Sequence, residues 1–223
     1  MKTFGTVNLP ILGAFWKYGS WLRWLVLVAF GGGLSLFPTH PILATFPIMI
    51  ALLIPAFFRC PHCIEPPAGT LVSPVSGRID DLEEVSEIPS CGGAGTRIGI
   101  FLSICDVHVT RAPVTGQVVA KNFIPGRAGN AISRHCGNRN QRNEILIETA
   151  AHEAVFMKQI SGAIARRVIF DPEPGDKMTA GAIVGMIRFG SRAEIFIPKI
   201  TGFRIHANLG DRVEAGRTII ATI

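Results

Sequence analysis

A turn motif that occurs twice constrains the fold of this chain more than any other feature. Residues 175–181 read Gly-Asp-Lys-Met-Thr-Ala-Gly, and residues 210–216 read Gly-Asp-Arg-Val-Glu-Ala-Gly. In each copy a Gly-Asp turn leads to an apolar residue and then to a second turn glycine, with a strand-like run behind it. The repeat predicts paired β-hairpins of similar shape.

Three further segments share a rhythm of proline followed by glycine: Ser73–Ile79, Ala112–Val118 and Ile197–Phe203. Together with the repeated turns they predict a mainly β domain over residues 60–223, built as a hairpin-rich sandwich or barrel. This architecture resembles the biotinyl and lipoyl carrier fold, in which a modified lysine lies on a hairpin between two similar halves. A swinging-arm carrier is therefore a rival function, but the chain has no Met-Lys-Met or Asp-Lys-Ala segment.

Two apolar runs precede this domain, from Trp21 to Phe37 and from Ile42 to Phe58, and a Pro-Thr-His-Pro turn separates them. Each run has about 17 residues, which is the lower limit for crossing a hydrocarbon core of roughly 30 Å. Residues 1–59 are expected to form a membrane-associated helical hairpin, either spanning or re-entrant. Lysine and arginine flank the runs on both outer sides, which places both ends and the β domain on the cytoplasmic side of the cell membrane.

The net charge of +6 favours binding of the protein to an anionic surface. An anionic membrane explains the charge and the apolar runs together, whereas no helix-turn-helix, zinc finger or aromatic-basic pattern supports nucleic acid as a partner. The odd number of five cysteines argues against a disulfide framework. The Cys60–Cys63 pair has no second ligand pair at suitable spacing, so no metal site is predicted.

The stretch from Gly185 to Pro198 alternates like a β-strand, but Gly190-Ser191 interrupts it, with an arginine close on either side. Glycine within a strand pattern usually marks a bulge or a close backbone approach. The alternative is chemical. A serine hydroxyl can attack the preceding glycine carbonyl when the backbone is held strained, because glycine has no Cβ to block the approach.

Two blocks carry a family resemblance: residues 187–192 read Ile-Arg-Phe-Gly-Ser-Arg, and residues 106–113 read Asp-Val-His-Val-Thr-Arg-Ala-Pro. From about Phe57 to its end the chain resembles the short form of phosphatidylserine decarboxylase. The resemblance implies self-cleavage between Gly190 and Ser191, conversion of Ser191 into a covalent pyruvoyl cofactor, and a tight complex of the two fragments. It further implies a carboxy-lyase that converts phosphatidylserine to phosphatidylethanolamine through a Schiff base.

His108 is the candidate for returning a proton to the substrate, because imidazole titrates near working pH. The Asp106-x-His108 spacing places both side chains on one face of a strand, where the carboxylate could orient the ring. Arginine offers a planar fork of donors to a lipid phosphate. The candidate phosphate ligands are Arg111, Arg188, Arg192 and, in the polar loop from Gly126 to Asn143, Arg142.

The chain departs from the family at two positions. Where the family reads Ser-Pro-Ala-Asp-Gly, with an aspartate that drives self-cleavage, this chain has Ser76. Where the family reads Asn-Glu-Arg-Asn, this chain reads Asn-Gln-Arg-Asn from Asn140. Three accounts of the missing aspartate stay open: Asp80 or Asp81 replaces it, His108 with Asp106 suffices, or maturation is slow or absent.

These departures keep alternative functions open. The chain could be an uncut, inactive homologue that binds anionic lipid through its apolar runs and arginines. It could also act on ether-linked serine phospholipids, because the reacting amine and carboxylate do not depend on the lipid tails. Exposed sheet edges would favour a homodimer.

Overall fold

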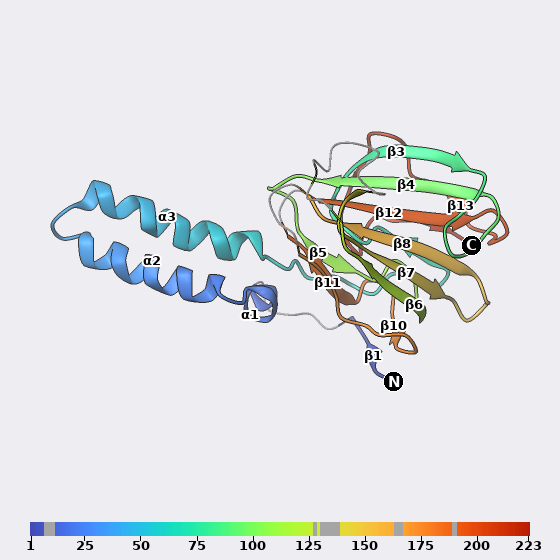
Figure 1. Cartoon of the computed structure of the whole chain (residues 1–223), viewed down its shortest axis with the longest axis horizontal. Helices are drawn as coiled ribbons and strands as arrows, with labels where there is room; N and C mark the ends of the chain where they lie inside the picture. Colours follow the sequence, from blue (N-terminus) through green and yellow to red (C-terminus); the bar gives the residue numbers. More distant parts are fainter. Residues whose placement is uncertain (7–11, 127–128, 130–138, 163–166, 189–190) are drawn as a thin grey trace. The chain divides into compact units, whose positions relative to one another are not determined.

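The computed structural model describes the chain except for residues 7–11, 127–128, 130–138, 163–166 and 189–190 (Figure 1). The chain divides into two compact units. The helical unit is Asn8–His62, and the β unit consists of Met1–Val7 together with Cys63–Ile223. Strands outnumber helices, so the predicted mainly β class is confirmed.

The helices are α1 (Gly13–Tyr18), α2 (Leu22–Leu36) and α3 (Pro41–Phe57). The strands are β1 (Thr3–Phe4), β2 (Thr70–Val72), β3 (Gly77–Val85), β4 (Gly95–Leu102), β5 (Val109–Arg111), β6 (Gly116–Ile124), β7 (Arg142–Glu148), β8 (Ala154–Ile160), β9 (Val168–Phe170), β10 (Lys177–Met178), β11 (Ile183–Ile187), β12 (Ser191–Pro198), β13 (Arg204–Ile205), β14 (Arg212–Val213) and β15 (Ile219–Thr222).

In the helical unit, the two apolar runs form α2 and α3, which lie side by side (Figure 1). Gly33 of α2 faces α3 so closely that a Cβ there would lie 2.6 Å from Cγ1 of Ile48. Large apolar side chains on both helices are exposed, including Trp24 and Ile42. None of the helices in the described ranges is both long enough and apolar enough to cross a membrane.

The β unit contains a nine-stranded sheet in the order β1-β10-β6-β7-β8-β12-β4-β3-β14. Its longer strands lie next to one another in Figure 1. Two three-stranded sheets, β5-β11-β9 and β13-β15-β2, accompany it. Strand β1 pairs in parallel with β10, with Thr3 opposite Lys177. Met1–Val7 therefore belongs to the β unit and not to the helical hairpin predicted for residues 1–59.

The main hydrophobic core lies between one face of the large sheet and the two small sheets. Strand β12 shows the alternation: Ala193, Ile195 and Ile197 belong to this core, together with residues of β2, β11 and β15. The alternate residues of β12 point to the opposite face, yet they are buried as well. A strand buried on both faces can hold a reactive residue away from water at its end.

The two copies of the repeated turn have the same hydrogen bonds. Gly175 and Gly210 adopt φ values of +92° and +95°, which a side chain would disfavour. Their N–H groups donate to the carbonyls of Val118 and Ile79, each at 2.8 Å. The aspartate after each glycine accepts a hydrogen bond from the N–H three residues earlier. The predicted similarity of the two turns is therefore confirmed.

Candidate active site

Two segments of chain connect the large sheet to a small sheet at the same place. Strand β12 pairs with β4, with Ser191 opposite Leu102, the last residue of β4. Strand β11 pairs with β5, and the N–H of Ile187 at its end donates to the carbonyl of His108 at 3.1 Å. The start of β12 therefore lies beside the end of β4, and the end of β11 lies beside His108, just before β5. This topology brings the two predicted catalytic residues to one edge.

Ser191 is the first residue of β12 and is fully buried. Its Oγ has no hydrogen-bond partner in the part of the chain that the structure describes. Buried hydroxyls are normally satisfied, so an uncommitted one needs a reason. A hydroxyl reserved for reaction is such a reason, and Ser191 thus fits the precursor of a pyruvoyl group. Gly190, the other half of the predicted cleavage site, lies outside the described residues.

His108 is fully buried and lies in the turn that precedes β5. Its Nδ1 is 2.9 Å from the main-chain oxygen of Asp106. Because a carbonyl oxygen can only accept, Nδ1 must carry the proton of this hydrogen bond. This leaves Nε2 as the ring atom that can exchange a proton with a substrate. The geometry agrees with the acid role expected for His108.

The expected role of Asp106 was wrong. Residues 103–108 form a turn and not a strand, so Asp106 and His108 do not share a strand face. The Asp106 carboxylate accepts hydrogen bonds from the N–H and Oγ of Ser103, at 2.8 and 2.7 Å. A serine three residues before an aspartate closes a turn in this way. Asp106 orients the His108 ring through its main-chain oxygen, while its carboxylate shapes the turn.

Ser76 has a structural role that the repeat explains. Its Oγ accepts a hydrogen bond from the N–H of Ala215 at 3.0 Å. In the other copy of the repeat, Thr115 accepts the equivalent bond from Ala180 at 3.0 Å. The Ser76 hydroxyl thus holds the end of the 210–216 turn, as the Thr115 hydroxyl holds the end of the 175–181 turn. This bond gives Ser76 a turn-holding role and identifies no base for self-cleavage.

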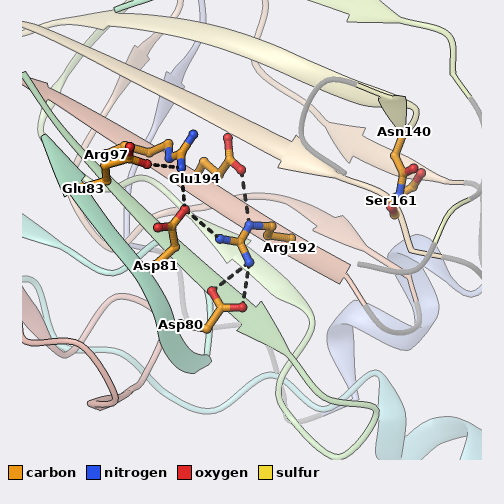
Figure 2. Close-up of polar contacts among 8 residues, drawn as sticks. All are labelled: Asp80, Asp81, Glu83, Arg97, Asn140, Ser161, Arg192 and Glu194. Carbon is orange, nitrogen blue, oxygen red and sulfur yellow. Dashed lines mark hydrogen bonds and ion pairs between the residues drawn. The ribbon is translucent and has the colours of Figure 1, made fainter. Parts of the chain in front are cut away.

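The segment that begins at Asn140 supports β5, the strand that follows His108. Asn140 donates to the carbonyl of Ser161 at 2.7 Å, and Figure 2 shows these two residues beside each other. Asn143 donates to the side-chain oxygen of Gln159 at 2.9 Å. Gln159 in turn donates to Oγ1 of Thr110 at 3.0 Å. These side chains connect β7 and β8 to β5, two residues after the histidine.

The arginines predicted to contact phosphate all have contacts with other protein groups. Arg111 is buried and donates to the carbonyl of Gly181 at 2.6 Å. Arg192 is fully buried and its guanidinium binds carboxylates. Arg142 donates through Nε to Glu144 at 2.7 Å. Arg111 and Arg192 are thus placed to hold the fold, and their predicted phosphate roles are not supported.

Arg188 is the arginine best placed to bind an anion. It follows β11 directly, three residues before Ser191. The main-chain N–H of Arg188 donates to the main-chain carbonyl of Arg167 at 3.2 Å. The two arginines are therefore neighbours, one after the end of β11 and the other before the start of β9. Burial lowers the pKa of Arg188, and the positive charge of Arg167 lowers it further. A bound anion would raise this pKa again, because a nearby opposite charge favours the charged form.

Arg167 is a site residue that the sequence patterns did not indicate. Its position beside Arg188 depends on the pairing of β9 with β11, where Val168 lies opposite Ile187. No local pattern encodes this pairing. The one available signal was a pair of arginines, Arg166 and Arg167, at the start of an apolar run.

Comparisons with known proteins identify the family of this chain. The family model described as phosphatidylserine decarboxylase matches residues 51–221, which include both connecting segments. A phosphatidylserine decarboxylase proenzyme of Mycobacterium ulcerans is 40% identical over 171 residues, covering 75% of this chain and 70% of that protein. A protein of the same name from Symbiobacterium thermophilum is 35% identical over 175 residues, covering 78% of this chain and 80% of the relative. This chain belongs to the phosphatidylserine decarboxylase family.

Proposed function

We propose that this protein decarboxylates phosphatidylserine to phosphatidylethanolamine with a pyruvoyl group made from its own Ser191. The observation that carries the proposal is the buried, uncommitted Oγ of Ser191 at the start of β12. His108, in the turn between β4 and β5, is the candidate acid at the same edge of the fold. Family membership and the names of the relatives support the substrate.

Formation of the group begins with attack of Ser191 Oγ on the carbonyl carbon of Gly190. The peptide bond becomes an ester and the amine of residue 191 is released. Elimination expels the new Gly190 carboxylate from Cβ and leaves dehydroalanine at position 191. Its imine form takes up water and releases ammonia, so that a pyruvoyl group remains. The chain then consists of Met1–Gly190 and a second piece that ends at Ile223.

The large sheet holds the two pieces together. Strand β12 lies between β8 and β4, and it is paired along most of its length with both neighbours. Its side chains are buried on both faces. Cleavage before Ser191 would therefore leave the start of the smaller piece inside the sheet of the larger one.

When formed, the pyruvoyl group supplies a carbonyl that accepts the electrons released as carbon dioxide leaves. The residues of this chain do the rest. His108, with Nδ1 held by the Asp106 carbonyl, takes up a proton at Nε2 to form the imidazolium and then gives that proton to the substrate α-carbon. Arg188, beside Arg167, binds the phosphate of the head group and so positions the serine moiety.

The helical unit would hold the enzyme at an anionic membrane, with the β unit on the cytoplasmic side. Support comes from exposed apolar side chains on α2 and α3, such as Trp24, Val28, Leu43 and Phe46. The net charge of +6 adds attraction to anionic lipid. The reacting amine and carboxylate of the head group do not depend on the lipid tails. Ether-linked serine lipids are therefore an equivalent substrate class.

The intact mass of the purified protein in denaturing conditions tests the proposal. Two chains are expected, and the smaller should correspond to residues 191–223 with a pyruvoyl group at its start. A single chain of 223 residues would contradict self-cleavage. That result would favour the uncut lipid-binding homologue, for which Ser76 in place of the family's aspartate is the supporting observation.

Arg188→Gln should weaken substrate binding. Loss of a charge-assisted contact to phosphate costs about 1.5–3 kcal/mol, which corresponds to a KM increase of roughly 10- to 150-fold with little change in kcat. Both constants are measured on the fully cleaved fraction with phosphatidylserine in mixed micelles. Arg142→Gln is the matched control, because Arg142 already pairs with Glu144. A loss in kcat with unchanged KM would show that Arg188 does not bind the substrate phosphate.

A further inference from the structure

Arg192, the residue directly after Ser191, is enclosed by three carboxylates (Figure 2). Its Nη1 lies 2.7 Å from both carboxylate oxygens of Asp80. Its Nη2 lies 3.3 Å from Asp81 Oδ2, and its Nε lies 3.2 Å from Glu194 Oε1. The side chain is fully buried. Each nitrogen of the guanidinium thus contacts a carboxylate, so the side chain is held in one position. Arg192 with Asp80, Asp81 and Glu194 is called the anchor below.

The anchor reaches across a neighbouring strand. Arg192 belongs to β12 and Asp80 to β3, with β4 between them. Gly99 of β4 makes room for this, because a Cβ at that position would overlap Nη2 of Arg192. Glycine within a strand often marks such a close approach. The side chain therefore connects β12 to β3 across β4, near the start of β12.

The three carboxylates differ in their other partners. Asp81 also binds Arg97 at 2.8 Å, and Glu194 lies opposite Lys158 in the pairing of β12 with β8. Both carboxylates are almost completely buried, whereas the Asp80 side chain is 29% exposed. Asp80 directs both of its oxygens to Arg192. Removal of the Asp80 charge is therefore the most selective way to weaken the anchor.

We propose that Asp80, acting through Arg192, positions Ser191 for self-cleavage and holds the start of β12 after the cut. This inference rests on the proposed function and adds residues to it. Attack on the preceding carbonyl needs Ser191 Oγ in a narrow range of positions, and misplacement by about 1 Å can cost on the order of 100-fold in rate. After cleavage the main chain no longer restrains residue 191 from the Gly190 side. The buried side chain of its neighbour Arg192 then fixes the new end.

The same contacts argue against Asp80 and Asp81 as the base that replaces the family's aspartate. Both Asp80 oxygens face the guanidinium of Arg192, and Oδ2 of Asp81 faces Arg192 and Arg97. Ser191 Oγ has no partner among the described residues, these carboxylates included. Asp80 and Asp81 are positioning residues. The account in which one of them takes the serine proton is not supported.

Asp80→Asn tests this role because it removes the charge and keeps the size. Cleavage, followed as the appearance of the 191–223 fragment during cell-free synthesis, should slow on the order of 10- to 100-fold. Its pH profile should keep the shape seen without the substitution. Glu83→Gln is the matched control, since Glu83 lies on the same strand, pairs with Arg97 and does not contact Arg192. Loss of the pH dependence would mean that Asp80 is the base and would overturn the proposal.

A second measurement does not depend on cleavage. In chains that carry Ser191→Ala, Asp80→Asn should raise the rate of hydrogen exchange at the first amides of β12. Gly99→Ala, which displaces Arg192 but leaves Asp80 intact, should do the same. Unchanged exchange in both variants would overturn the proposal. Because this readout uses uncut chains, it gives an answer even if the unsubstituted protein fails to cleave and the proposed function falls.

Discussion

Ser191→Ala is expected to yield a single uncut chain of 223 residues with no decarboxylase activity. Alanine has no oxygen to attack the Gly190 carbonyl, so neither the ester nor the pyruvoyl group can form. Loss should be complete, because no other residue can supply an electron-accepting carbonyl at this position. Intact mass in denaturing conditions and release of carbon dioxide from carboxyl-labelled phosphatidylserine measure the two effects.

Ser161→Ala is the matched control for this experiment. Ser161 is also fully buried, and its Oγ likewise has no hydrogen-bond partner in the described part of the chain. Burial of an uncommitted hydroxyl is thus common to both serines, while the position after glycine at the start of β12 belongs to Ser191. The control should cleave and turn over normally. Normal cleavage of Ser191→Ala would disprove the assignment of the cleavage site.

The parts of the fold that were predictable from the sequence are those governed by local chemistry. The turns at Gly175 and Gly210 need a positive φ and a capping aspartate, and both needs are visible in four or five consecutive residues. The apolar runs likewise become α2 and α3 with boundaries close to those expected. Asp106 shows the limit of this reasoning, since its carboxylate accepts hydrogen bonds from Ser103 in a turn where a strand was expected.

The parts that were not predictable depend on strand order. Gly99, Asp80 and Arg192 meet because β12, β4 and β3 are neighbours, although they lie far apart along the chain. The proximity of Arg167 to Arg188 likewise follows from the pairing of β9 with β11. Sequence patterns indicated the candidate Gly-Ser pair and the histidine. They did not indicate the residues that hold them, because those contacts arise only when the sheets form.

His108→Ala should reduce turnover of phosphatidylserine by roughly 100- to 10,000-fold, the usual range for loss of a general acid. The measurement uses fully cleaved enzyme, so that an effect on self-cleavage does not contribute. His108→Asn is the more selective variant. Its side-chain amide can still donate to the Asp106 carbonyl, as Nδ1 does, but it has no group that exchanges a proton at Nε2. Both variants should lose similar activity if proton transfer is the role of the ring.

A single-turnover experiment separates proton return from substrate binding. Without the acid, carbon dioxide should still leave once per active site, because its loss needs only the electron-accepting carbonyl. Phosphatidylethanolamine should then lag behind, since the α-carbon waits for a proton. His206→Ala is the control, because His206 is an exposed residue that pairs with Thr222 through Nε2 at 2.8 Å, apart from the turn before β5. If carbon dioxide and phosphatidylethanolamine stay in step at the normal rate in His108→Asn, another group returns the proton and His108 only shapes the turn.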